Sequence, residues 1–432
     1  MGRDCDDEQF ATISAQSSAV GSVSAKAAAR GCLGRRVVTG RERTRVALFA
    51  THPIQYHVPW FQHLAARPEL DLKIYFGFEP DAAQQGIGFG IDFKWDIPLR
   101  EGYASELLQN VAPRPALGTF GGCDTPEVGD VLRAWAPDAV ILTGWQSKML
   151  IQAAWAAKRL GVPRIIRGES NALRQRAAWK RLLHRAWLRT YDQFLAIGRA
   201  NEAFYRQAGV RASRIHPCPY FVDNERFVRD AGALAPRREE LRRAWAIAEA
   251  SICFLYSGKL IGKKRPFDLL EALKVAHARG IPAHLLVVGD GELGADLRSF
   301  AAEAQLPVTF AGFLNQTDMA KAYVAADCLV LPSDTGETWG LVVNEAMACG
   351  IPALVSDQVG CGPDLVSEGV TGRIYPMGDV AALAQRLMDL SRRPQELRTM
   401  GAAARQRVLS GYTVEHAVEG TLAAVAAAVG AR

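Results

Sequence analysis

The sequence lacks any apolar run of the ~20 residues that would span a bilayer. Its opening residues, MGRDCDDEQF, are too acidic and polar for a secretory signal. The eight cysteines are scattered, and no two show the C-x-x-C spacing of a zinc site or a redox dithiol. These absences predict a cytoplasmic protein with reduced thiols and without structural zinc.

Strong charge of either sign is also missing. The formal net charge is +6 over 432 residues. Such a mild excess suits anionic ligands or a membrane surface and is too weak to indicate a nucleic-acid partner. Hydrophobic residues make up 49% of the chain, enough for two or three domains with sizeable cores.

Apolar runs typical of buried parallel strands alternate with stretches of helical periodicity, twice over. The pattern breaks near HPCPYFVDNERF, as at a hinge. We therefore predict an α/β protein with two doubly wound, Rossmann-like domains at residues 44–220 and 221–412. Residues 413–432 form a helix that could return to the N-terminal domain. Residues 1–43 lack periodicity and indicate a disordered extension or a misassigned start.

Three loops of the second domain each follow a strand, where doubly wound sheets bind ligands. The first contains Gly258, Lys259 and Lys264 within SGKLIGKK. Glycines let a phosphate approach the backbone, and lysines supply point charges for it. The spacing is not that of a Walker loop. A solvated basic turn is the alternative.

The second loop, VVGDGELG, contains G-x-G-x-x-G beginning at Gly289. A nicotinamide enzyme would carry an acidic residue at the end of the next strand to hold the ribose. That strand, VTFAG, instead ends in Gly312 and is followed by Phe313. A dinucleotide site is therefore disfavoured.

The third loop places Glu337 just before a helix and Glu345 one turn inside it, with Gly340 between them. Free amides at a helix N-terminus form an anion site without a metal. The alternative is that Glu337 is only a helix cap and Glu345 a surface residue.

ETWGLVVNEAMACGIPALVSD resembles the E-x7-E signature of retaining family 4 glycosyltransferases, the group 1 transferases of the GT-B fold. SGKLIGKKRPFDLLEAL, VGDGELGADL and EGVTGRIYPMGD are similar to other landmarks of that family, in the same order. PYFVDNERF resembles its hinge phrase and THPIQYHVPWFQHLA an opening loop of some members. The resemblance covers roughly residues 44–425.

The resemblance implies a nucleotide-diphosphate sugar as donor, transfer with retention, and no metal or other cofactor. Glu345 would bind the donor ribose and Glu337 the transferred sugar. Lys259 and Lys264 would neutralise the departing diphosphate. Backbone at four further positions would hold the donor: Gly258, Gly289, Gly340 and Leu341. The D-x-D at Asp4 to Asp6 lies in the extension.

Two departures from the family concern these expectations. Lys259 stands where Arg is more usual, and RIIRGESN lacks the histidine that many members have in the N-terminal domain. The candidates for the acceptor side of the cleft are therefore His52, Gln55, His57 and Glu169.

The expected acceptor is a sugar or a lipid-linked glycan. A sugar-nucleotide epimerase and a non-catalytic nucleotide-sugar binding protein remain alternatives. The basic helix at 173–190 carries Trp179, Leu182, Leu183, Ala186 and Trp187 on one face. One interpretation is that this helix contacts the inner face of an anionic membrane peripherally. The other is that its apolar stripe packs on the N-terminal sheet. Packing on the sheet is favoured for the two tryptophans.

Overall fold

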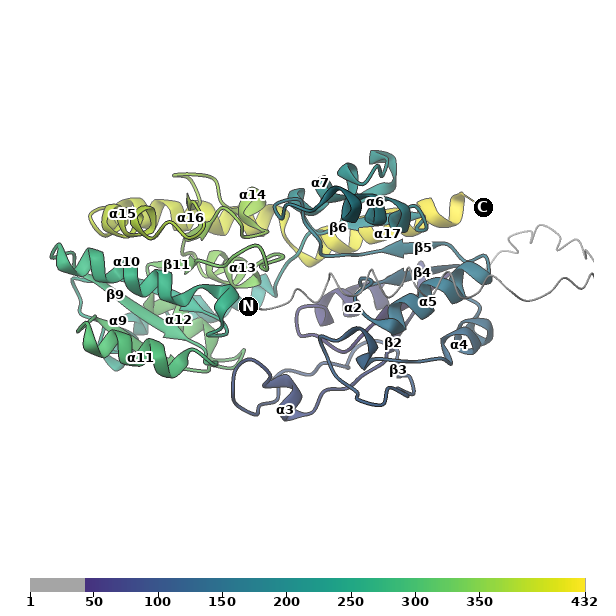
Figure 1. Cartoon of the computed structure of the whole chain (residues 1–432), viewed down its shortest axis with the longest axis horizontal. Helices are drawn as coiled ribbons and strands as arrows, with labels where there is room; N and C mark the ends of the chain where they lie inside the picture. The colour runs from purple at the N-terminus through teal and green to yellow at the C-terminus, as the bar shows by residue number, and fades with distance from the viewer. Residues whose placement is uncertain (1–42, 432) are drawn as a thin grey trace, which may run out of the picture.

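The computed structural model describes residues 43–431 and has two lobes, each built on a parallel sheet (Figure 1). The extension predicted at residues 1–43, with its D-x-D, falls outside the described residues apart from Arg43. The prediction of two Rossmann-like domains is confirmed. In the described part of the chain, no helix is long and apolar enough to cross a membrane.

The N-terminal sheet has seven strands in the order β3-β2-β1-β4-β5-β6-β7. All neighbouring strands run parallel. The strands are β1 (Thr44–Ala50), β2 (Leu70–Phe76), β3 (Ser105–Leu107), β4 (Ala139–Leu142), β5 (Arg164–Ile166), β6 (Gln193–Ala196) and β7 (Ile215–Pro217). The helices are α2 (Val58–Ala65), α3 (Ala82–Gln85), α4 (Val128–Trp135), α5 (Lys148–Arg159), α6 (Ala178–Leu188) and α7 (Arg199–Gln207).

Successive residues of β1 face opposite sides of this sheet, as the pleat of a strand requires. Ala47 and Phe49 pack with α4, α5 and α7, whereas Val46 and Leu48 pack with α2 and a C-terminal helix. The sheet is thus covered on both faces, which explains the unbroken apolar runs in its sequence.

The C-terminal sheet has six parallel strands in the order β10-β9-β8-β11-β12-β13. They are β8 (Ile252–Ser257), β9 (Ala283–Val288), β10 (Val308–Gly312), β11 (Cys328–Leu331), β12 (Ala353–Ser356) and β13 (Gly372–Tyr375). The helices are α8 (Asn224–Leu234), α9 (Arg238–Ala244), α10 (Pro266–Ala278), α11 (Gly294–Glu303), α12 (Met319–Ala325), α13 (Leu341–Ala348), α14 (Gly362–Leu365), α15 (Val380–Ser391) and α16 (Pro394–Gly411).

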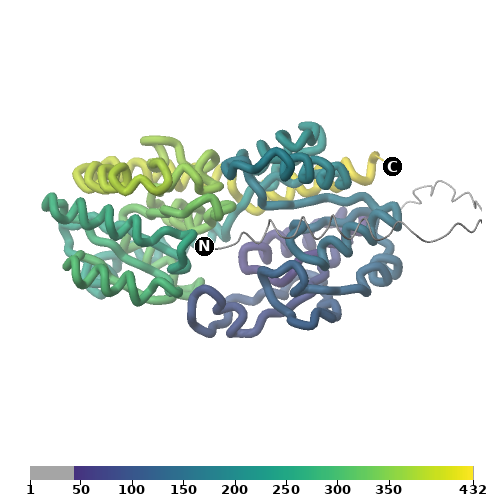
Figure 2. The backbone as a smooth tube through the Cα atoms, viewed as in Figure 1, coloured from purple at the N-terminus to yellow at the C-terminus, as the bar shows by residue number. Residues whose placement is uncertain are grey.

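The last helix, α17 (Val414–Gly430), leaves the C-terminal lobe and lies along the N-terminal one (Figure 2). It packs on α2, β6 and β7. The approach is close at Gly420, where a Cβ atom would stand 1.5 Å from the Pro217 carbonyl oxygen. A side chain there would therefore separate α17 from the first domain.

The buried face of α6 is not the apolar stripe that was predicted to pack on the sheet. Its buried residues are His184 and Leu188, one turn apart. Trp179 and Leu182 are 53% and 66% exposed. At 100° per residue they lie on the side opposite His184, so the packing prediction is wrong for both. Trp187 is half-buried, in line with that prediction.

Candidate functional site

The loop between β11 and α13 carries the first candidate, Glu337. Its carboxylate forms an ion pair with the Lys264 ammonium and accepts a 3.0 Å hydrogen bond from the Ser333 hydroxyl. Gly340 begins α13 with a φ of +99°, which favours glycine. The first amides of a helix have no partner within it. The Val343 amide donates to the Gly340 carbonyl at 2.9 Å, so the amides of Leu341 and Val342 are the ones that could meet an anion beside this ion pair.

The glycines of the two neighbouring loops allow these loops to touch. A Cβ atom on Gly289 would stand 2.0 Å from the Gly258 carbonyl oxygen. Both residues also have positive φ, +150° at Gly258 and +121° at Gly289. The structure thus brings together Lys264 and Glu337, with the loops of Gly258 and Gly289 side by side.

Lys259 does not join this group. Its ammonium donates a 2.5 Å hydrogen bond to the Ile87 carbonyl of the N-terminal domain and lies 5.0 Å from the Phe89 ring centre. Burial lowers the pKa of Lys259, and the neighbouring charges of Lys263 and Lys264 add to the effect. A diphosphate would meet Lys259 only after that contact opened.

Glu345 is 1% exposed, so the alternative that it is a surface residue is wrong. Its two carboxylate oxygens accept hydrogen bonds from the hydroxyls of Tyr323, at 2.5 Å, and Tyr56, at 2.9 Å. Burial raises the pKa of Glu345, and the two tyrosine hydrogen bonds oppose that rise. Both carboxylate oxygens of Glu345 thus have a tyrosine partner, one from each domain.

On the N-terminal side, His57 is buried and its Nε2 lies 3.3 Å from Nη1 of Arg167. Burial holds the pKa of His57 well below its usual range, and Arg167 and His52 lower it further. A neutral His57 therefore accepts from Arg167, whose guanidinium also lies 4.3 Å from the Tyr220 ring centre. Glu169 accepts from the Tyr220 hydroxyl.

The other two candidates lie nearby with different partners. Nδ1 of His52 is 2.9 Å from the Thr51 hydroxyl, and burial lowers the pKa of His52 to about 4. Gln55 lines a cavity of about 210 Å³ between the domains, together with Tyr56, Arg226 and Gln316. Gln55 therefore lines a space between the domains, whereas His52 and His57 are not among the residues that line this cavity.

Several polar residues of the site escaped the sequence analysis: Tyr56, Arg167, Tyr220, Tyr323 and Ser333. Ser333 could have been found from its place at the end of β11. Tyr56 lies between two residues that were singled out, but nothing local shows that it reaches the other domain. Among the described residues, no group of three or more His, Cys, Asp or Glu side chains is placed to hold a metal ion.

Two family models match the chain. Residues 237–407 match the group 1 glycosyl transferases and residues 99–220 match the glycosyl transferase 4-like domain. A GDP-mannose-dependent alpha-mannosyltransferase of Mycolicibacterium smegmatis is 31% identical over 302 residues, 67% of this chain and 73% of that protein.

A second relative is a GDP-mannose-dependent phosphatidylinositol monomannoside mannosyltransferase of Corynebacterium glutamicum. It is 29% identical over 203 residues, 46% of this chain. The match spans only about half of each of two relatives. It covers 52% of the Corynebacterium glutamicum protein and 46% of an N-acetyl-alpha-D-glucosaminyl L-malate synthase of Bacillus anthracis.

Solved structures show the same fold at low identity. A Rickettsia africae glycosyltransferase has a TM-score of 0.68 at 13% identity, covering 90% of this chain and 99% of that one. Anabaena HepE in complex with UDP has a TM-score of 0.65 at 18% identity, covering 88% and 98%. Two Rossmann-like domains of this kind make up the GT-B fold.

The two family models and the Mycolicibacterium smegmatis relative identify the family to which the chain belongs. The chain belongs to the group 1 glycosyl transferases, the family 4 type, and is a glycosyltransferase.

Proposed function

We propose that this enzyme transfers a sugar from a nucleoside-diphosphate donor, with retention and without a metal, to a sugar or lipid-linked acceptor. The observation that carries the proposal is the Lys264–Glu337 ion pair beside the N-terminus of α13. A cation, a carboxylate and the first amides of a helix lie together there. The neighbouring Thr338 carbonyl accepts a 3.4 Å hydrogen bond from Asn171 of the N-terminal domain.

Each part of this arrangement has a distinct role in the proposal. The first amides of α13, next to Gly340, hold the diphosphate, because the positive end of a helix favours anions. Lys264 neutralises the charge that develops on the leaving diphosphate, the contribution that a metal makes in other transferases. Glu337 then exchanges its bond to Lys264 for hydroxyls of the transferred sugar.

Glu345 binds the donor ribose in this proposal, which requires the Tyr56 hydroxyl to leave it. Tyr56 belongs to the N-terminal domain and Glu345 to the C-terminal one, so a small opening of the domains separates them. Tyr323 lies in the same domain as Glu345 and keeps its hydrogen bond.

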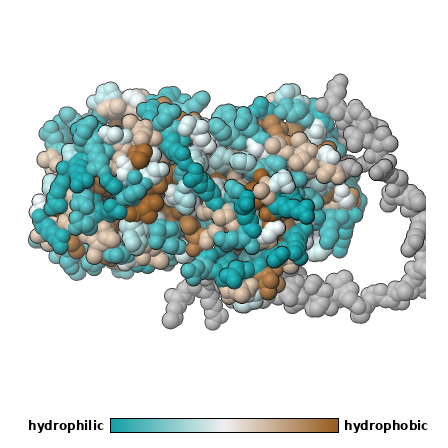
Figure 3. Space-filling view, turned by 90° about the horizontal axis from the view of Figure 1, so that it is seen from above, coloured by the Kyte–Doolittle hydropathy of each residue, from teal (hydrophilic) through white to brown (hydrophobic). Residues whose placement is uncertain are grey.

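The acceptor side of the proposal includes contact with an anionic membrane surface. Trp179 and Leu182 are exposed on α6, and Arg185 of the same helix is exposed beside them. Interfacial tryptophan with basic neighbours suits such a surface. The face seen from above in Figure 3 is mostly hydrophilic with hydrophobic patches on both lobes. The Corynebacterium glutamicum relative is named for a phosphatidylinositol monomannoside, which supports an acceptor at a membrane surface.

The test begins with melting curves of the full chain against GDP, UDP and ADP and their sugars. A ligand at ~100 times its dissociation constant adds ~2.7 kcal/mol of stability, so the right base gives a clear upward shift. GDP-mannose is the first sugar to try, because several relatives are named for it.

The donor so found is then incubated with cell-derived glycolipid, with and without EDTA. We expect a product with the donor's anomeric configuration, formed equally in EDTA. Epimerised donor without transfer would indicate an epimerase instead, and binding without turnover would indicate a binding protein. An inverted product would overturn retention, and loss of activity in EDTA would overturn metal-free transfer.

A further inference from the structure

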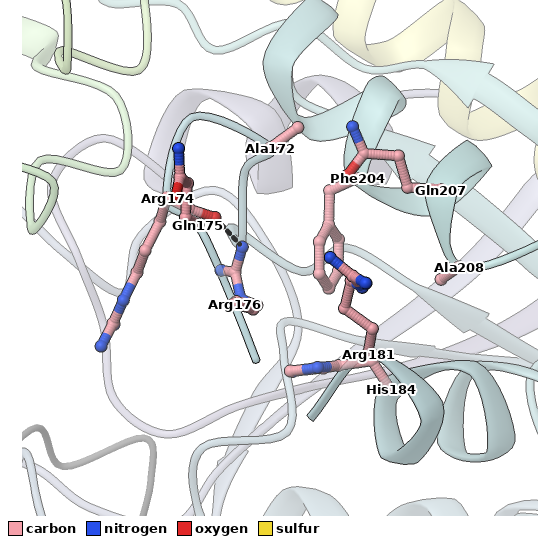
Figure 4. A pocket seen from close by; sticks show the side chains of 9 residues that line it. All are labelled: Ala172, Arg174, Gln175, Arg176, Arg181, His184, Phe204, Gln207 and Ala208. Atoms are coloured by element: carbon pink, nitrogen blue, oxygen red, sulfur yellow. Dashed lines mark hydrogen bonds between the residues drawn. The ribbon is translucent and has the colours of Figure 1, made fainter. Parts of the chain in front are cut away.

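A cavity of about 290 Å³ opens in the N-terminal domain away from the Lys264–Glu337 pair. It lies between the segment before α6, α6 itself and the end of α7 (Figure 4). We call it the arginine pocket. It is lined by Ala172, Arg174, Gln175, Arg176, Arg181, His184, Phe204, Gln207 and Ala208.

Among the residues that the structure describes, those lining the pocket include three arginines and no Asp or Glu. Arg174, Arg176 and Arg181 contribute three guanidinium groups. The sequence contains no acidic residue between Glu169 and Asp192. Guanidinium groups match phosphate oxygens in geometry.

The ring of Phe204 contacts two other side chains that line the pocket, Arg176 and His184. The Arg176 guanidinium lies 4.8 Å from the Phe204 ring centre and donates to the carbonyl oxygens of Asn171, at 2.7 Å, and Arg174, at 3.1 Å. His184 packs edge-on to Phe204 at 5.3 Å. Its Nδ1 donates a hydrogen bond to the Lys180 carbonyl oxygen at 2.8 Å.

Arg174 connects the pocket with the interdomain cleft. In Figure 4 its side chain extends away from Phe204. Together with Gln175 it also lines a second, open cavity, whose other side is formed by Thr335, Gln358 and Met377 of the C-terminal domain. Thr335 is two residues from Glu337, so a molecule that reacts near Glu337 could extend past Arg174 into the pocket.

We propose that the arginine pocket binds a phosphate group of the acceptor, either of a lipid headgroup or of a soluble phosphorylated sugar. The inference rests on the proposed function, because it assigns the pocket to the acceptor of that reaction. It adds that the acceptor carries phosphate on the side remote from the bond being formed. Exposed Trp179 and Leu182 on the neighbouring face of α6 place the pocket close to the proposed membrane contact.

The first experiment measures binding of glycerol 3-phosphate, a headgroup phosphate without acyl chains, to the full chain by calorimetry. We compare Arg181→Glu with Arg189→Glu, which changes the same charge on an exposed residue of the same segment outside the pocket. Hydrogen bonds to charged groups predict that Arg181→Glu weakens binding about tenfold or more, while Arg189→Glu does not. Equal binding by the two variants, or none by the parent chain, would overturn the assignment to soluble phosphates.

The second experiment distinguishes the source of the phosphate. Vesicles of phosphatidic acid present a phosphomonoester, whereas phosphatidylglycerol of equal surface charge presents only a diester. A preference for phosphatidic acid that Arg181→Glu removes and Arg189→Glu retains supports a lipid headgroup. If neither glycerol 3-phosphate nor phosphatidic acid is affected by Arg181→Glu more than by Arg189→Glu, the pocket is not a phosphate site.

The rise in melting temperature caused by a nucleotide donor distinguishes failure of the proposed function from failure of the arginine-pocket proposal. Arg181→Glu is expected to retain the donor-induced shift of the parent chain, since the pocket lies away from Gly258 and Glu337. A parent chain without any donor shift would defeat the proposed function but leave the glycerol 3-phosphate result standing on its own.

Discussion

The hydroxyl of Tyr56 donates a 2.9 Å hydrogen bond to Oε1 of Glu345, across the boundary between the two domains. Glu345 is buried, and its other oxygen is held by Tyr323 of its own domain. One residue proposed to bind the donor is therefore also a contact that holds the domains together. The donor ribose and the interdomain contact of Tyr56 compete for the same carboxylate.

This competition predicts opposite effects of Tyr56→Phe on stability and on nucleotide affinity. The variant leaves a buried carboxylate short of one donor, which costs roughly 1.5–3 kcal/mol and lowers the melting temperature. The ribose no longer displaces a tyrosine, so nucleotide binding tightens, by roughly four- to twelvefold if half of that energy is recovered. Tyr323→Phe is the control: it should lower stability without tightening binding. Equal nucleotide affinity in Tyr56→Phe and the parent chain would contradict the competition.

Neighbouring lysines allow a sharp test of the anion site. Lys264 pairs with Glu337, whereas the adjacent Lys263 is exposed. Lys264→Ala removes a direct counter-charge to the diphosphate, so we expect donor affinity and transfer to fall tenfold or more, roughly 1.5–3 kcal/mol. Lys263→Ala should change both less than threefold, as a solvent-screened charge does. Donor affinity is measured by titration and transfer by initial rates. If Lys264→Ala and Lys263→Ala were equally active, Lys264 would not belong to the site.

The fold was predictable because buried parallel strands leave unbroken apolar runs. All the runs read as strands, such as RVALFA and CLVLPS, lie on strands of the structure. The strands missed were β3, β7 and β13, each only three or four residues long and each at an edge of its sheet. Such edge strands carry no continuous apolar pattern, and β7 ends in a proline within the segment interpreted as a hinge.

The site was less predictable than the fold. Glu337 and Lys264 could be selected because each follows a strand of one domain, and both loops lie at the same edge of the sheet. Contacts of Tyr56 with Glu345 and of Lys259 with Ile87 depend on how two separately folded domains meet. No local pattern encodes that relation, since the partners are 289 and 172 residues apart.

Burial of His52 predicts a specific acid sensitivity. Its pKa is about 4 in the folded protein and near 6.5 unfolded. Protonation therefore favours the unfolded chain, so the stability linked to neutral His52 is present above pH 6.5 and lost as pH falls toward 4. His52→Asn should lose less stability over that interval, by at most about 3 kcal/mol. Melting curves from pH 7.5 to 4 measure the difference, with His277→Asn as an exposed control; parallel curves for the two variants would refute it.

Exposed Trp179 and Leu182 predict vesicle binding that depends on both apolar and basic groups of α6. The parent chain should sediment with phosphatidylglycerol vesicles at low salt and less at high salt, since each basic group contributes about 1 kcal/mol near such a surface. Replacing Trp179 and Leu182 together by alanine should abolish sedimentation. Trp155→Ala is the matched control, because Trp155 is 43% exposed on α5. A double variant that sediments like this control would exclude α6 as the contact.

A segment of the N-terminal domain, residues 87–96, reaches over the loops proposed to hold the diphosphate, and we call it the clasp. Phe93 of the clasp lies 4.4 Å from the Phe313 ring centre, and Thr317 donates a 2.5 Å hydrogen bond to Asp96. A Cβ atom on Gly291 would stand 2.9 Å from the Gly88 carbonyl oxygen, so clasp and loop are in direct contact. We therefore expect a nucleotide to reach these loops only after the clasp lifts.

Phe313→Ala should therefore speed both association and dissociation of the nucleotide. Loss of the aromatic contacts destabilises the closed clasp by about 1 kcal/mol, which raises the open population roughly fivefold. Both rates pass through the open form, so the dissociation constant changes much less than either rate. Stopped-flow binding gives the rates, and hydrogen exchange of residues 87–96 reports the opening directly. Phe300→Ala, which removes a half-buried ring packed on Phe267 of the same domain, should leave both measurements unchanged. If the two variants bind nucleotide at the same rates, lifting of the clasp does not limit entry, and Lys259 is released from Ile87 by some other motion.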